Sequence, residues 1–184
     1  RSADTLHHKR TKTSGGVTNA VEFRVEAGDI TQSTADVIVV NLFEGVTRPG
    51  GGTGAIDAAL GGAVSKLIEQ GDIRGKAGEL TLIHTLGKMP SPRVLVAGLG
   101  KASDFDVDAV RNLSANVARY LRRPGVKRVA TIAHGAGIAM LDGAACAQAI
   151  AEGTVLGSYR FTRHKSKSEE NGEIERFAII EHDD

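Results

Sequence analysis

The segment Val37-Ile38-Val39-Val40, inside the stretch Ala35–Val40, decides the fold, because a continuous apolar run of this length is typical of a strand buried on both faces. A glycine-rich turn follows it, Gly50-Gly51-Gly52-Thr53-Gly54-Ala55-Ile56-Asp57, and opens the segment 53–70, whose apolar residues recur at helical spacings. A buried strand, a tight turn and a helix in this order predict an α/β protein.

Strands and helices continue to alternate on both sides of this segment. Further strands are predicted at 21–25, 79–86, 93–99, 126–133 and 176–181. Gly61-Gly62 breaks the helical segment 53–70 in two, and further helices are predicted at 107–121, capped by Asp104 or Asp106, and at 141–159. We therefore expect a three-layer α/β/α sandwich built on a mixed, mainly parallel sheet.

The length of 184 residues predicts one folded domain. Residues 1–20 show no periodicity and are interpreted as a flexible or vector-derived leader, so the domain is expected over 21–184. Aromatic residues make up only 4% of the chain, which argues against a surface of stacking aromatics for single-stranded nucleic acid. The single Cys146 cannot close an intramolecular disulfide, and no apolar run approaches the ~20 residues of a membrane span. We expect a cytoplasmic protein with no membrane partner.

The formal net charge of +1 is unevenly distributed along the chain. The leader carries the positive excess, whereas residues 21–184 are mildly acidic, which makes a nucleic-acid partner an unfavoured prediction. One local basic cluster is interpreted as a solvated helix end, and it consists of Arg119, Arg122, Arg123, Lys127 and Arg128.

The sequence matches no short catalytic or metal-binding motif. It contains no H-E-x-x-H, C-x-x-C or G-x-S-x-G pattern. His84 and His134 fall at or near predicted strand ends and are interpreted as structural, and Cys146 lies in an alanine-rich helix, as a small buried side chain would. We predict neither a catalytic residue nor a metal ligand in this chain.

Two glycine loops are the candidate binding elements. Gly51, Gly52 and Gly54 follow one predicted strand, and Gly135 and Gly137 follow another in the same position. Loops at the carboxyl ends of parallel strands can flank one crevice, where backbone N–H groups and helix N-termini hold an anion. The alternative is that these glycines make tight turns with nothing bound.

The first half of the chain resembles a macro domain. The similar residues are Gly28-Asp29-Ile30-Thr31, the strand that ends in Asn41, and the turn 50–57. Macro domains bind ADP-ribose, so the resemblance implies a crevice in which Asp29 contacts the adenine amine, Asn41 lines the site and the glycine loops hold the diphosphate. The segment Asn41-Leu42-Phe43-Glu44 departs from the small Asn/Ala-rich pattern of that family.

A second set of motifs extends over nearly all of 21–184. These motifs are Leu42-Phe43-Glu44-Gly45, Gly54-Ala55-Ile56-Asp57-Ala58-Ala59-Leu60-Gly61-Gly62, Gly75-Lys76-Ala77-Gly78-Glu79, Val96-Ala97-Gly98-Leu99-Gly100-Lys101 and Glu152-Gly153-Thr154-Val155-Leu156-Gly157-Ser158-Tyr159-Arg160-Phe161. Together they are similar to the amino-terminal domain of the cytosol (leucyl) aminopeptidases, the M17 metallopeptidases. That domain is itself a macro-like α/β sandwich, which reconciles the two resemblances.

The aminopeptidase resemblance implies a parent hydrolase that removes N-terminal residues from peptides with two divalent metals, Zn or Mn. Those metals belong to a separate carboxy-terminal catalytic domain, whose N-T-D-A-E-G-R-L motif is absent here. The chain is therefore expected to be a non-catalytic amino-terminal domain, inactive alone, whose partners are that catalytic domain and a hexamer, and whose role is assembly and access control. Two alternatives stay open, an ADP-ribose or nucleotide-binding macro module and a regulatory nucleic-acid contact domain.

Overall fold

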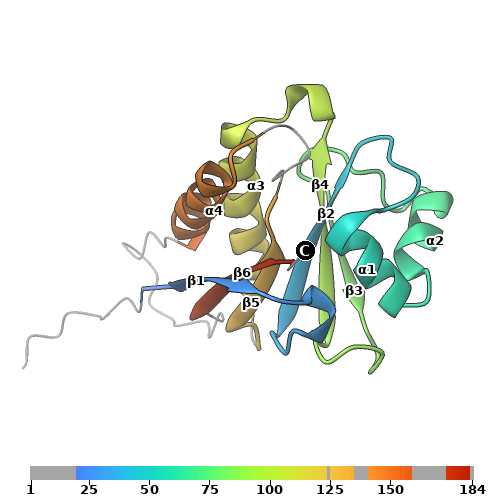
Figure 1. Ribbon diagram of the computed structural model, residues 1–184, viewed down its shortest axis with the longest axis horizontal. Helices are drawn as coiled ribbons and strands as arrows, with labels where there is room; N and C mark the ends of the chain where they lie inside the picture. Colours follow the sequence, from blue (N-terminus) through green and yellow to red (C-terminus); the bar gives the residue numbers. More distant parts are fainter. Residues whose placement is uncertain (1–19, 124, 135–140, 159–172, 183–184) are drawn as a thin grey trace, which may run out of the picture.

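The computed structural model describes residues 20–123, 125–134, 141–158 and 173–182. In these residues a six-stranded sheet lies between two layers of helices (Figure 1), so the predicted α/β/α sandwich is confirmed. The strands are β1 (Glu22–Ala27), β2 (Val37–Phe43), β3 (Leu80–His84), β4 (Arg93–Gly100), β5 (Arg128–Ile132) and β6 (Arg176–Glu181). The helices are α1 (Gly51–Ala59), α2 (Ala63–Gln70), α3 (Val107–Leu121) and α4 (Gly143–Ser158), with short 3-10 turns η1 (Ile30–Gln32) and η2 (Ala102–Asp104).

The strand order across the sheet is β1-β6-β5-β2-β4-β3. Every neighbouring pair is parallel except β3 and β4, which are antiparallel. The mixed, mainly parallel sheet is thus confirmed. The antiparallel pair is closed by a hairpin loop in which the N–H of Thr85 donates to the carbonyl of Pro92 at 3.0 Å.

Strand β2 lies in the middle of the sheet and is buried along its whole length, as the apolar run predicts. Its side chains alternate between two hydrophobic cores. Val37 and Val39 belong to the core that includes residues of α3 and α4, whereas Ile38 and Val40 belong to the core that includes residues of α1 and α2. Figure 1 shows these two helix pairs on opposite faces of the sheet.

Side-chain carboxylates cap the starts of α2 and α3. Asp106, one of the two predicted caps, accepts a hydrogen bond from the N–H of Ala109 at 2.8 Å and starts α3. Asp57 on α1 caps the following helix, because its carboxylate accepts from the N–H of Ser65 at 3.0 Å and from its hydroxyl at 2.5 Å. The predicted break at Gly61-Gly62 falls between α1 and α2.

The glycine-rich loop before β3 packs main chain against main chain. A Cβ added to Gly98 would overlap the carbonyl oxygen of Lys76, and one added to Gly75 would lie 2.5 Å from the carbonyl oxygen of Phe43. The carboxylate of Glu79 closes the loop by accepting a hydrogen bond from the N–H of Gly75 at 2.7 Å. These motif residues hold the end of β4 against the loop.

The two faces of β1 differ in character. On one face the carboxylate of Glu22 accepts from Arg24 at 2.7 Å and from Arg176 on β6 at 3.1 Å. These bonds, that from Arg24 foremost, lower the pKa of Glu22. On the other face the ring of Phe23 packs against Phe177, with centroids 6.0 Å apart. The sheet therefore ends in a strand that is charged on one face and apolar on the other.

Candidate functional site

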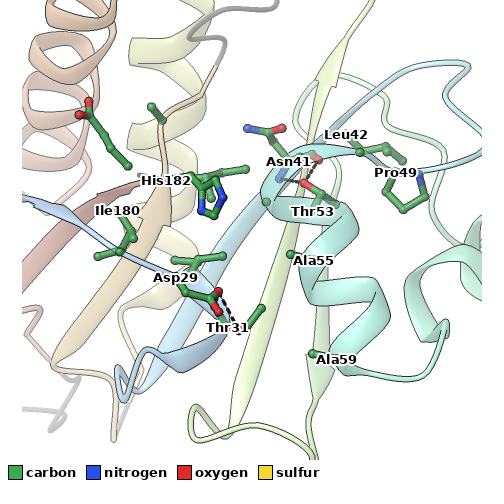
Figure 2. A pocket seen from close by; sticks show the side chains of 18 of the residues that line it. Asp29, Thr31, Asn41, Leu42, Pro49, Thr53, Ala55, Ala59, Ile180 and His182 are labelled. Carbon is green, nitrogen blue, oxygen red and sulfur yellow. Dashed lines mark hydrogen bonds between the residues drawn. The ribbon is translucent and has the colours of Figure 1, made fainter. Parts of the chain in front are cut away.

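A pocket of about 1230 Å³ opens at the carboxyl ends of the parallel strands (Figure 2). The N-terminus of α1, the turn after β1 and the ends of β2, β5 and β6 all contribute to its wall. Crevices of this kind are the usual ligand sites of open α/β sheets. The lining residues are Gly28, Asp29, Ile30, Thr31, Asn41, Leu42, Phe43, Val46, Pro49, Gly50, Gly51, Gly52, Thr53, Ala55, Ala59, Ile132, Ala133, Ile180, Glu181 and His182.

Asp29 lies at the mouth of this pocket and caps the short turn η1. One of its carboxylate oxygens accepts from the N–H of Thr31 at 2.9 Å and from the hydroxyl of Thr31 at 2.7 Å. These two bonds, the one from the hydroxyl first, lower the pKa of Asp29. His182 faces the same region (Figure 2) and favours the ionised carboxylate through its charge. The carboxylate is therefore a fixed negative group with its second oxygen open to a donor.

Asn41 lies at the end of β2, and its amide is held by a buried polar network. The amide N–H donates to Nδ1 of His134 at 3.0 Å, which leaves the ring proton on Nε2, 3.3 Å from the hydroxyl of Thr131. That hydroxyl donates in turn to the carbonyl of Ile132 at 2.9 Å. Because His134 is buried, desolvation lowers its pKa to about 4, so the ring is neutral. The predicted structural role of His134 agrees with this network.

Thr53 connects the first turn of α1 to the end of β2. Its buried hydroxyl donates to the carbonyl of Asn41 at 2.7 Å, and the N–H of Asn41 points back at the hydroxyl oxygen at 3.4 Å. This contact sets the helix N-terminus at the rim of the pocket. The first N–H groups of a helix have no partner within the helix, so this end of α1 attracts an anion.

The predicted glycines of the first loop have conformational or packing reasons. Gly51 has a φ of +54° and begins α1, and a Cβ on Gly52 would lie 2.7 Å from Cγ2 of Ile132. A Cβ on Gly54 would lie 2.8 Å from the carbonyl oxygen of Pro49. Gly51 and Gly52 line the pocket, whereas Gly54 faces the preceding turn. A positive φ at Gly51 and close packing at Gly52 and Gly54 therefore account for these glycines without a bound phosphate.

The structure brings Asp29, Asn41, Gly51 and Gly52 to one pocket, and their role as a binding site stays a prediction. The predicted second loop, with Gly135 and Gly137, lies outside the described residues. Sequence reasoning did not find the lining residues Thr53, Glu181 and His182. The signal for the last two was their position at the carboxyl end of the predicted strand 176–181, which meets the other parallel strands.

The charge of the pocket wall does not favour a strongly anionic ligand. Among the described lining residues none is Lys or Arg, while Asp29 and Glu181 are acidic. The attraction for an anion therefore comes from the N-terminus of α1.

The other sequence features occupy structural positions. Cys146 is buried, as expected. Two members of the basic cluster are paired, Lys127 with Glu175 at 3.1 Å and Arg128 with Asp36 at 3.4 Å. The described part of the chain holds no group of three or more His, Cys, Asp or Glu placed to bind a metal ion. None of its helices has the length and apolar character needed to cross a membrane.

Known proteins share both the sequence pattern and the fold. Residues 39–168 match the model of the N-terminal domain of the cytosol aminopeptidase family. A probable cytosol aminopeptidase from Alkaliphilus metalliredigens is 32% identical over 153 residues, which are 83% of this chain. The match covers only 30% of that relative's length.

Two solved structures have a similar fold. A mutant of tomato leucine aminopeptidase has a TM-score of 0.68 at 21% identity, with 89% of this chain and 33% of that chain covered. A Trypanosoma brucei macrodomain in complex with ADP has a TM-score of 0.65 at 15% identity, with 86% of this chain and 63% of that chain covered. The chain thus has a macrodomain-like fold and, by the match over residues 39–168, belongs to the cytosol aminopeptidase family as its N-terminal domain.

Proposed function

We propose that this domain is a non-catalytic part of a two-metal leucyl aminopeptidase and serves its assembly and the control of access to its active site. The observation that carries the proposal is the match to the N-terminal domain of the family over residues 39–168. The relative from Alkaliphilus metalliredigens is much longer than the matched part, which leaves room for a separate catalytic domain with its two Zn or Mn ions.

The polar groups of the pocket support a non-catalytic role. Asn41 and Thr53 on the pocket wall, and His134 bonded to Asn41, are hydrogen-bonded to protein atoms, which supports a structural role for these three side chains. The motif glycines hold main chain together, as Gly98 does against Lys76. A cytoplasmic location belongs to the same proposal, in keeping with the name that the relatives carry, and so does a hexameric parent.

A peptidase assay tests the absence of catalysis. The chain is incubated with a leucine chromogenic substrate and added Mn²⁺ or Zn²⁺, beside the full-length Alkaliphilus metalliredigens relative as positive control. We expect turnover by the relative and none by this chain. Turnover by this chain above the buffer background would overturn the proposal.

The assembly role needs a separate experiment. In the full-length relative, the region matched by this chain is either deleted or replaced by residues 21–184 of this chain, which include all six strands. We expect deletion to reduce the oligomer measured by light scattering and the replacement to retain it. An unchanged oligomer after deletion would exclude the assembly role.

A second candidate function is the binding of ADP-ribose or a related nucleotide in the pocket. The favouring observation is the pocket itself, which places Asp29 across from the N-terminus of α1 in a fold shared with a macrodomain in complex with ADP. Calorimetry with ADP-ribose tests it. Heat of binding should be present in the wild type and in Asp72→Ala, an exposed control outside the pocket, and lost in Asp29→Ala. No heat in the wild type would eliminate this function.

A further inference from the structure

Strand β1 is an open edge of the sheet. It pairs with β6 on one side, and within the described residues no strand pairs with its other side (Figure 1). The register from Glu22 opposite Arg176 to Ala27 opposite Glu181 runs without a bulge, and the strand contains no proline. Edge strands are commonly protected by bulges, prolines or inward-pointing charges. β1 has no bulge and no proline, its charged side chains lie on one face only, and Val25 on the other face is 58% exposed.

The backbone of β1 has hydrogen-bonding groups that point away from the sheet. The N–H of Glu22 donates to the carbonyl of Glu175 at 2.9 Å, and the N–H of Gly28 donates to the carbonyl of Glu181 at 2.8 Å. In a parallel pair, alternate residues direct both backbone groups to the same neighbour. The groups of Phe23, Val25 and Ala27 therefore point to the open side, where an added strand can accept and donate.

We propose that this edge pairs with β1 of a second copy of the chain, antiparallel, with Val25 opposite Val25 of the second copy. This register pairs the outward backbone groups of Phe23 with those of Ala27 of the second copy. It also sets Arg24 opposite Glu26 of the second copy and, by symmetry, Glu26 opposite Arg24 of the second copy. Both charge contacts are attractive.

The charges of β1 select this register over its neighbours. Two adjacent registers are allowed by the backbone, and both set like charges against each other. One places Arg24 opposite Arg24 and Glu22 opposite Glu26 of the second copy, and the other places Glu26 opposite Glu26 of the second copy. Registers shifted further leave much of Glu22–Ala27 unpaired. Val25 lies beside Ile179, on the face of the sheet that packs against α3 and α4. The two Val25 side chains therefore meet on an apolar face.

The expected dimer is closed and weak. A two-fold axis uses the edge of both copies, so the pairing stops at two and forms no fibre. A single strand pair is smaller than the ~1,600 Å² of a standard interface, which predicts a dissociation constant above about 1 µM. The inference is independent of the proposed function, because the edge joins copies of this domain whether or not a catalytic domain accompanies it.

Sedimentation equilibrium of the chain tests the dimer, at protein concentrations from about 10 µM to about 1 mM. We expect the apparent mass to rise toward the dimer with concentration. Arg24→Glu sets like charges against each other at both symmetric contacts and should weaken the dimer by about tenfold. The double variant Arg24→Glu/Glu26→Arg restores opposite charges and should restore association. Thermal melting of each variant confirms that the domain itself stays folded.

Cysteine cross-linking reports the register. Residues directly opposite in this kind of pair have Cα atoms about 5.5 Å apart, a distance that a disulfide spans. Val25→Cys should therefore form a covalent dimer under mild oxidation at least about tenfold faster than the equally accessible control Arg24→Cys. Cys146 is buried and does not compete. A monomer at every concentration, equal association of the charge variants, or equal cross-linking at both positions would overturn the proposal.

Discussion

The buried imidazole of His134 predicts how the stability of the domain depends on pH. Desolvation lowers its pKa from the ordinary 6.5 to about 4, so the unfolded chain binds a proton in a range where the folded chain does not. The stability that the neutral ring provides is complete above pH 6.5 and is lost as the pH falls toward 4. Because the unfolded chain takes up this proton and the folded chain does not, the free energy of unfolding falls by about 2 kcal/mol between pH 8 and pH 5.

Urea unfolding at a series of pH values measures this effect. The window stays above about pH 5, because carboxylates of the unfolded chain take up protons mainly below it. His134→Gln removes the titrating group and leaves an oxygen that can accept from Asn41, so its stability should change little across the window. His84→Gln is the matched control, because His84 is exposed at the end of β3 and should leave the wild-type slope unchanged. If His134→Gln keeps the full slope, the neutral buried ring is not the cause and the reasoning fails.

Three further substitutions test the packing. Gly98→Ala places a Cβ against the carbonyl oxygen of Lys76 and should lower the free energy of unfolding in urea by about 2–3 kcal/mol. Gly143→Ala is the control, because the space around its Cβ is open, and should lower it by less than about 1 kcal/mol. Equal losses would contradict the close approach at Gly98. Asp57→Ala removes the cap of α2 and should lower stability by about 1 kcal/mol, measured as a lower melting temperature. An unchanged melting temperature would mean that this cap does not stabilise the domain. Thr53→Val removes the hydroxyl that bonds the carbonyl of Asn41 and should cost about 1–3 kcal/mol by the same urea assay. Thr53→Ser keeps that hydroxyl and should recover most of the loss; equal losses in both variants would contradict the role of the bond.

The central strand and the cap of α3 could be predicted because their signals are local. Val37 to Val40 form a continuous apolar run, and the structure buries all of β2. Asp106 precedes a periodic apolar segment and accepts the N–H of Ala109, as a cap at that position must. Both features depend on neighbours in sequence, so the chain reveals them without knowledge of the fold.

The predicted ends of strands and helices differ from the structure where a loop interrupts the apolar pattern of the sequence. The strand predicted at 79–86 extends only from Leu80 to His84. Glu79 lies outside the strand, in the loop that its carboxylate closes by accepting hydrogen bonds from the N–H groups of Arg74 and Gly75. Leu86 lies outside the strand because its φ of +52° belongs to the hairpin loop. The helix predicted from Thr53 begins two residues earlier, inside the glycines, at Gly51.

The chemistry of the pocket could not be predicted, because its partners are distant in sequence. The amide of Asn41 binds the ring of His134, and this pair meets only because β5 lies beside β2. Likewise Gly52 is small because Ile132 approaches it. The sequence alone shows an asparagine and a glycine at positions suited to a ligand. It does not show that His134 and Ile132 already contact these two residues.

The junction of Gly75 and Gly98 also affects how sequence signatures are interpreted. At both positions the room for a side chain is taken by a backbone carbonyl of another segment. Any protein that builds this junction has to keep glycine there, whether it hydrolyses peptides, binds a nucleotide or only supports a neighbour. These two motif glycines are therefore required by the packing of the fold. Similarity to another protein at these positions is evidence of a shared fold, and it is not evidence of a shared reaction.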